Sequence, residues 1–250
     1  MTAALTAKGL EKSFGSLIVA SDIAFELPVG ERCALIGPNG AGKTTLINLL
    51  TGMLQPDSGQ ILLGGEDISR LPPQRRVRMG LVRTFQINSL FPRLNPLEAV
   101  TLAVAERRGE TRDFLRRLAT KAESIEEAWG ILKSLRLDGV CYRETRELAY
   151  GQQRLLEIAL ALATRPKVLL LDEPAAGVPK EESGELFSVI DGLSRDLTIF
   201  FIEHDMDVVF RFASRILVMV SGRLLLEGTP AEIAADERVR EVYLGAAHHG

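Results

Sequence analysis

The chain has 250 residues, enough to bury a substantial core and to form one large domain or two small ones. Its 30 basic and 33 acidic residues give a formal charge of −3, which excludes the strongly basic surface of a dedicated nucleic-acid-binding protein. No apolar run reaches the ~20 residues of a membrane span, and the first residues do not resemble a signal peptide. We expect a cytoplasmic protein in which Cys33 and Cys141 are core residues.

Short strands dominate residues 5–36, where apolar clusters alternate with glycine and proline turns. Phe14 lies in the segment KSFG of this region. Two interpretations of its ring stay open: a core side chain, which residue statistics favour, or an aromatic surface that stacks on a purine base.

A phosphate-binding loop follows this region. The segment GPNGAGKTT has the spacing G-x-x-x-x-G-K-[ST], after a buried strand at 32–36 and before a helix that Gly52 ends. Backbone N–H groups and the helix N-terminus bind phosphate oxygens in such loops, the lysine bridges two phosphates and the hydroxyl reaches Mg²⁺. The expected nucleotide-binding residues are Gly37, Pro38, Asn39, Gly40, Ala41, Gly42, Lys43, Thr44 and Thr45, with Thr44 at the metal.

The middle of the chain is expected to be helical. A strand at 60–63 turns at Gly64-Gly65, and a strand at 81–86 ends in the polar residue Gln86. Beyond Pro96, apolar residues at three- and four-residue spacing predict a helical insertion over about 90–150, in which Trp129 has a packing role. Arginines crowd the segment before it and are interpreted as a solvated face: Arg75, Arg76, Arg78 and Arg83.

Two further strands end in polar residues. The apolar run 167–171 stops at Asp172 and Glu173, and the run 198–202 stops before Glu203 and His204. Parallel strands carry their ligands at their carboxyl ends, so these side chains are expected beside the phosphate loop. Successive strand residues face opposite ways, but a turn after Asp172 would re-aim Glu173. A strand–turn–strand over 216–226, a short helix after Thr229-Pro230 and a loose tail with two histidines complete the chain.

Taken together, GPNGAGKTT, Gln86, LAYGQQ, LLLDEP and His204 occur in the order and approximate spacing of the ATP-binding subunits of ABC transporters, which the chain resembles over nearly its whole length. LAYGQQRLLEIA, DEPAAGV, IEHDMDVV and the terminal VYLG are most similar to subunits of branched-chain amino acid importers. The resemblance implies an α/β fold with a P-loop NTPase core, an antiparallel β subdomain and a helical insertion. It implies a single ATP-binding domain over 1–250, with a core of 1–89 and 151–250 and a helical subdomain of about 90–150. The family signature, LAYGQQ in this chain, lies at the end of that subdomain.

The resemblance also implies a role for each motif residue. Phe14 stacks on adenine, Gln86 senses the γ-phosphate and contributes to the metal site, and Asp172 supports Mg²⁺. Glu173 acts as general base on the hydrolytic water, and His204 contacts the γ-phosphate. The signature residues Ala149, Tyr150, Gly151 and Gln152 complete the ATP site of a second subunit.

Two departures from the family pattern are visible. Ala149 stands where the signature usually has serine, and Tyr150 where it usually has glycine; both resemble the importer subgroup. The segment AAGVP after Pro174 lacks the aspartate common in the loop that crosses the dimer interface. Lys43, Asp172, Glu173 and His204 are all kept, so hydrolysis is expected.

The resemblance predicts a Mg²⁺-dependent ATPase that powers import of branched-chain or other hydrophobic amino acids or a related small solute. Its partners would be a second ATPase subunit, identical or different, two transmembrane permeases and, indirectly, a solute-binding protein. The chain would meet the inner face of the membrane only through the permeases and would bind no nucleic acid. The alternatives are the ATPase of a lipopolysaccharide exporter, a non-transport ABC ATPase and a non-hydrolysing nucleotide sensor.

Overall fold

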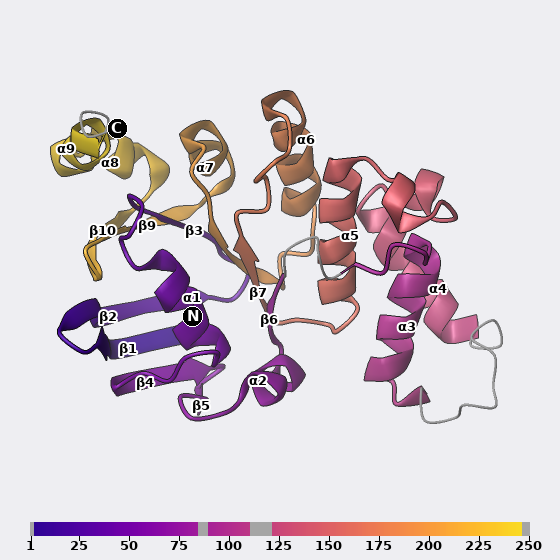
Figure 1. Cartoon of the computed structure of the whole chain (residues 1–250), viewed down its shortest axis with the longest axis horizontal. Coiled ribbons are helices and arrows are strands. Elements are labelled where there is room, and N and C mark those ends of the chain that lie inside the picture. Colours follow the sequence, from indigo (N-terminus) through magenta and orange to yellow (C-terminus); the bar gives the residue numbers. More distant parts are fainter. Residues whose placement is uncertain (1–2, 85–89, 111–121, 247–250) are drawn as a thin grey trace. The chain divides into compact units, whose positions relative to one another are not determined.

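The computed structural model describes residues 3–84, 90–110 and 122–246. The chain forms two compact units (Figure 1). Unit 1 contains residues 1–83, 167–174 and 194–250, and unit 2 contains residues 84–166 and 175–193. The chain therefore leaves unit 1 twice, once after the strand that ends at Arg83 and once after Pro174.

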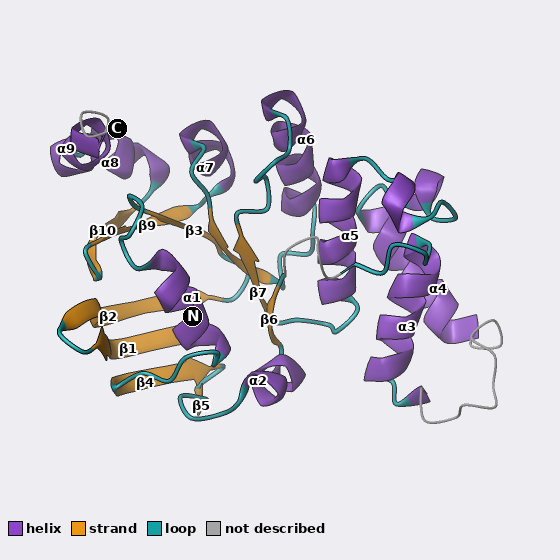
Figure 2. Cartoon of the chain, in the orientation of Figure 1, coloured by secondary structure: helices purple, strands orange, loops and turns teal. Residues whose placement is uncertain are grey.

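A six-stranded sheet organises unit 1 (Figure 2). Its strand order is β10-β9-β3-β8-β7-β6, and every pair is parallel except β9 with β10. The central strands are apolar and almost fully buried, as parallel strands covered on both faces require. The strands are β3 (Arg32–Ile36), β6 (Leu81–Arg83), β7 (Val168–Asp172), β8 (Thr198–Ile202), β9 (Arg215–Val220) and β10 (Arg223–Gly228).

A four-stranded antiparallel sheet also belongs to unit 1, as expected for the β subdomain. Its order is β2-β1-β4-β5, and the turn between the last two strands lies at Gly64-Gly65 as the sequence predicts. Its apolar face joins the six-stranded sheet in one core, where the rings of Phe25 and Phe200 stack with centroids 5.6 Å apart. The strands are β1 (Ala3–Phe14), β2 (Leu17–Pro28), β4 (Ser58–Leu63) and β5 (Glu66–Asp67).

Four of the described helices of unit 1 each follow a strand of one of the two sheets. The short helix expected after Thr229 is present, begins at Pro230 and is capped by the Thr229 side chain. A further helix after it was not predicted from the sequence. The helices are α1 (Lys43–Thr51), α2 (Pro73–Met79), α7 (Met206–Phe212), α8 (Pro230–Ala235) and α9 (Glu237–Ala246).

The expected solvated face of arginines is wrong for Arg76 and Arg83. Arg76 is fully buried, and burial lowers its pKa to about 10. Its guanidinium caps the end of α1, where the last carbonyls of a helix lack partners within the helix. It donates hydrogen bonds of 2.7 to 2.9 Å to the backbone carbonyls of Leu49, Leu50, Ser69 and Leu71.

Unit 2 is helical, and the expected insertion of about 90–150 lies within it together with α5 and α6. The first helix begins after Asn95, whose side chain accepts from the Glu98 amide while the Glu98 carboxylate accepts from the Asn95 amide. The elements are α3 (Pro96–Arg107), α4 (Ala122–Ser134), the 3₁₀ turns η4 (Asp138–Val140) and η5 (Thr145–Glu147), α5 (Tyr150–Leu162) and α6 (Lys180–Asp191). Within the expected insertion, residues 111–121 lie outside the described part of the chain.

Candidate active site

The phosphate loop connects β3 to α1, the strand–loop–helix context that the motif requires. Gly42 caps α1 with a left-handed φ of 103°. A Cβ at this position would lie 2.6 Å from the Val19 carbonyl oxygen, so only glycine fits where the backbone turns into the helix. Because Gly42 has no side chain, no side chain caps the first amides of α1 from this position.

Lys43 is the buried cation of this loop, with 7% of its surface exposed. Its Nζ donates to the carbonyl oxygens of Gly37 at 2.7 Å and Pro38 at 3.0 Å. Burial lowers the pKa of Lys43, and the charges of Glu173 and Asp172 oppose this shift. Thr44 and Thr45 follow Lys43 in the first turn of α1, next to the loop. Thr44 is exposed and Thr45 is half-buried.

The turn that re-aims Glu173 is present. β7 ends at Asp172, and Glu173 adopts a left-handed φ of 49°, which is uncommon for a residue other than glycine. Its amide donates to the Ile202 carbonyl at 3.1 Å, and its Oε1 lies 2.7 Å from Nε2 of His204. Strain of this kind persists where surrounding contacts hold it and is frequent at functional sites. The two side chains that the sequence placed at neighbouring strand ends thus meet directly.

Asp172 has a different partner, which the sequence did not predict. Nη2 of Arg83 donates to its Oδ2 at 2.5 Å, and Nη1 of Arg83 donates to Oδ1 of Asn48 at 2.9 Å. Arg83 ends β6, Asp172 ends the adjacent β7, and Asn48 lies on α1. The parallel pairing of β6 with β7, with Arg83 opposite Leu170, would have indicated this contact if it had been known beforehand.

Phe14 ends β1 with 52% of its surface exposed, so the core interpretation of this ring is wrong. Nζ of Lys12 lies 5.6 Å from the ring centroid and also pairs with Asp57 at 2.6 Å. The exposed ring is available for stacking. Gln86, expected at the γ-phosphate, lies outside the described residues.

The signature residues open α5 in unit 2. Ala149 precedes the helix and has no side-chain oxygen with which to cap it, while Oε1 of Gln152 accepts from the Ala149 amide at 3.1 Å. Half of a capping box is therefore present, and the other amides of the first turn have no side-chain partner from Ala149.

The sequence profile of the ABC transporter family matches residues 20–176, and that of the branched-chain amino acid ATP-binding cassette transporters matches residues 223–249. The high-affinity branched-chain amino acid transport ATP-binding protein BraF of Pseudomonas aeruginosa is 39% identical over 252 residues, covering 97% of this chain and 98% of BraF. LivG of Escherichia coli K12, a protein of the same description, is 40% identical over 251 residues, covering 97% and 98%.

The chain belongs to the ABC transporter ATP-binding family. Solved structures agree with this: the ADP conformation of the ATP-binding cassette MJ1267 has a TM-score of 0.86 at 30% identity and covers 98% of this chain and 100% of its own. A nucleotide-free ATP-binding cassette has a TM-score of 0.83 at 30% identity, covering 96% and 98%. The family resemblance and the α/β fold predicted from the motifs are confirmed.

As an ABC family protein, the chain binds nucleotide. Among the helices that the structure describes, none combines the length and apolar composition of a membrane span.

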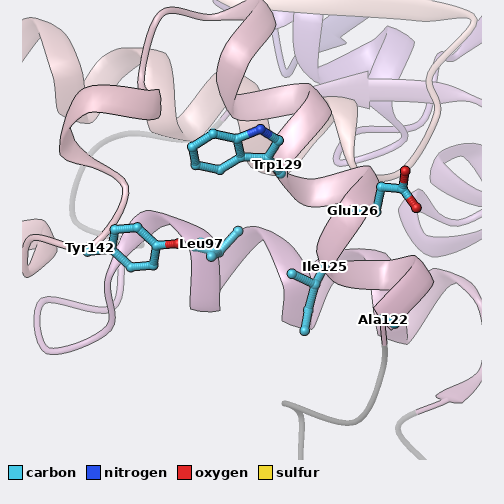
Figure 3. A pocket seen from close by; sticks show the side chains of 6 residues that line it. All are labelled: Leu97, Ala122, Ile125, Glu126, Trp129 and Tyr142. Atoms are coloured by element: carbon cyan, nitrogen blue, oxygen red, sulfur yellow. The ribbon is translucent and has the colours of Figure 1, made fainter.

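The described part of unit 2 also holds an apolar groove of about 380 Å³ between α3 and α4 (Figure 3). Trp129, predicted as a packing residue, is 39% exposed and lines this groove, whose other lining residues are Leu97, Ala122, Ile125, Glu126 and Tyr142. None of the expected nucleotide-binding or catalytic residues lines it.

Proposed function

We propose that the chain is the ATP-hydrolysing subunit of an importer for branched-chain or other hydrophobic amino acids or a related small solute. The observation that carries the proposal is the pairing of Glu173 with His204 at the ends of β7 and β8, next to the strand that leads into the phosphate loop. BraF and LivG, both named as branched-chain amino acid transport proteins, support the importer over the exporter and non-transport alternatives.

The phosphate loop would hold the nucleotide. Loop amides and the first turn of α1 suit phosphate oxygens, and the Lys43 ammonium, which bonds to neutral carbonyls, would gain from exchanging them for phosphate oxygens. Phe14 would stack on the adenine ring. Thr44 and Asp172 offer the hydroxyl and carboxylate oxygens that Mg²⁺ prefers, with Gln86 as a further ligand, and the ion would neutralise charge on the phosphates.

Glu173 would act as general base. Its carboxylate takes the proton from the attacking water, and the 2.7 Å contact with Nε2 of His204 fixes the direction in which the carboxylate points. His204 would also contact the γ-phosphate. Phosphoryl transfer needs positioning and charge stabilisation more than covalent chemistry, and these residues supply both.

The signature would serve a partner site. One chain carries one phosphate loop and one signature, so we propose that two such subunits, identical or different, enclose two ATP molecules. Two permeases and a solute-binding protein would complete the importer, and the chain would lie on the cytoplasmic face of the membrane through the permeases. ATP would favour the closed pair and hydrolysis the open one. No nucleic-acid partner is proposed.

Phosphate release tests the catalytic assignment. Glu173→Gln should keep ATP binding, lose at least a hundredfold in turnover and accumulate as an ATP-bound dimer in size-exclusion chromatography. Glu66→Gln, at an exposed position of β5, is the matched control and should behave as wild type. Turnover unchanged in Glu173→Gln would overturn the general-base role.

Recovery of partners tests the transport assignment. The chain purified from membranes with ATP present should bring down two multi-span permeases and an ABC ATPase subunit, identified by mass spectrometry. Ribosomes, nucleic-acid proteins or soluble assembly factors in their place would refute import while leaving the ATPase assignment intact.

A further inference from the structure

A buried arginine connects the signature helix to the loop that follows Pro174, within unit 2. Arg154 lies one turn into α5 and is 8% exposed. Nη1 donates to Oε2 of Glu157 at 3.1 Å, and Nη2 donates to the Tyr150 hydroxyl at 3.3 Å and to the Ala176 carbonyl at 3.2 Å. One guanidinium thus joins the first turn of α5, its second turn and the backbone of the loop 175–178.

The loop is shaped to receive this contact. Its residues Ala175-Ala176-Gly177-Val178 carry no polar side chain, so only backbone groups can fix it by hydrogen bonding. The Val178 amide closes a turn onto the Ala175 carbonyl at 3.0 Å. Gly177 has a left-handed φ of 79°, and a Cβ there would lie 3.0 Å from ring atoms and the hydroxyl of Tyr150. The Tyr150 ring therefore lies against the loop backbone, at the signature position where the family usually has glycine.

The electrostatics make the contact costly to break. The Arg154 charge is buried, and its guanidinium carbon also lies 5.4 Å from the centroid of the Tyr150 ring. Within the described residues, Nε of Arg154 and Oε1 of Glu157 have no hydrogen-bond partner. Loss of any one of the acceptors of Arg154 would be destabilising, because it would leave more of a buried cation without a hydrogen-bond partner.

We propose that Arg154 is a positioning residue, which holds the signature turn and the loop 175–178 in one arrangement so that both meet a second ATP-binding subunit together. The proposal rests on the proposed function, since it assigns that meeting to the subunit pair. In this arrangement Tyr150 contacts the loop from the position where the family usually has glycine. The hydrogen bond from Arg154 to Ala176 holds the loop, which lacks the usual aspartate.

Hydrogen–deuterium exchange of the nucleotide-free chain tests the link itself. In Arg154→Met, which removes the donors and keeps most of the volume, the amides of residues 175–178 should exchange at least tenfold faster. Arg154→Lys should give a smaller increase because it keeps the charge and one donor. Peptides from α3 and α4 should keep the wild-type rate. The matched control is Arg146→Met, an exposed arginine of the same unit that pairs with Glu144.

An unchanged rate at 175–178, or an equal rise throughout unit 2, would overturn the proposal. If Arg154→Met does not fold, Tyr150→Phe serves instead: it removes one acceptor and keeps the ring, and it should still raise exchange at 175–178 about threefold. No rise in that variant would also refute the link.

Kinetics test the consequence for catalysis. Arg154→Met should lower kcat about tenfold with KM for ATP within twofold of wild type, and Arg154→Lys should restore part of kcat. A change in KM alone would contradict the positioning role. If the wild-type chain itself released no phosphate, the proposed function would fail while the exchange result would still stand or fall on its own.

Discussion

The buried carboxyl of Glu157 should make the stability of the protein depend on pH near neutrality. Burial raises its pKa from 4.5 to about 7, and the hydrogen bond and charge of Arg154 only partly oppose the shift. A carboxyl whose pKa is higher in the folded state contributes stability that is complete below pH 4.5 and is lost as pH rises through about 7. The whole effect is at most about 3 kcal/mol.

About 1.3 kcal/mol of this contribution falls between pH 6 and pH 8. For a chain of this size that corresponds to a Tm lower by about 3 to 5 °C at pH 8 than at pH 6. Other groups titrate too, so the test is the difference between wild type and Glu157→Gln, whose side chain keeps its shape and cannot ionise. Thermal unfolding at pH 5, 6, 7 and 8 measures it.

The variant should show a flatter profile than wild type between pH 6 and pH 8. Identical slopes in the two proteins would mean that burial does not shift the pKa of this carboxyl.

Three further outcomes follow from the structure. Arg76→Met should lower the free energy of unfolding by about 3 kcal/mol, because four carbonyls lose their donor. The control Arg75→Met, at an exposed neighbouring position, should change it by no more than about 0.5 kcal/mol. Equal effects of the two variants in urea unfolding would refute the capping role. Gly177→Ala should cost at least about 1 to 2 kcal/mol through its left-handed φ, and adding Tyr150→Ala should recover only the part due to the clash. Lys43→Ala should weaken binding of a fluorescent ATP analogue at least tenfold, while Glu173→Gln keeps it; equal affinities for wild type and Lys43→Ala would contradict the loop assignment.

The sequence predicted the parts of the site whose geometry is local. The spacing from Gly37 to Thr44 requires one strand–loop–helix arrangement, and the structure has it. The meeting of Glu173 and His204 was also predictable, because both follow apolar strands of one parallel sheet and neighbouring strands end at the same edge.

The arginines were not predictable in this way. Arg76 and Arg83 stand in a polar, arginine-rich segment that has the composition of a surface, yet each has acceptors on elements far away in the chain. Leu49 lies 27 residues before Arg76, and Asn48 lies 35 residues before Arg83. The contact of Arg154 with Ala176 escaped prediction for the same reason: a backbone carbonyl offers no signal in the sequence. For Phe14, residue statistics favoured a core position, but the ring is exposed, as the stacking interpretation requires.

The carboxylates at the strand ends each have a partner in this chain, Arg83 for Asp172 and His204 for Glu173. A polyphosphate approaching two unpartnered carboxylates would meet a repulsive field, and Arg83 cancels part of it. Lys43 bonds to the neutral carbonyls of Gly37 and Pro38, and these contacts do not cancel its positive charge, which attracts the incoming anion. Loss of the Arg83 charge would therefore be felt first in the rate at which nucleotide enters the site, and most strongly at low ionic strength, where charges act over the longest distance.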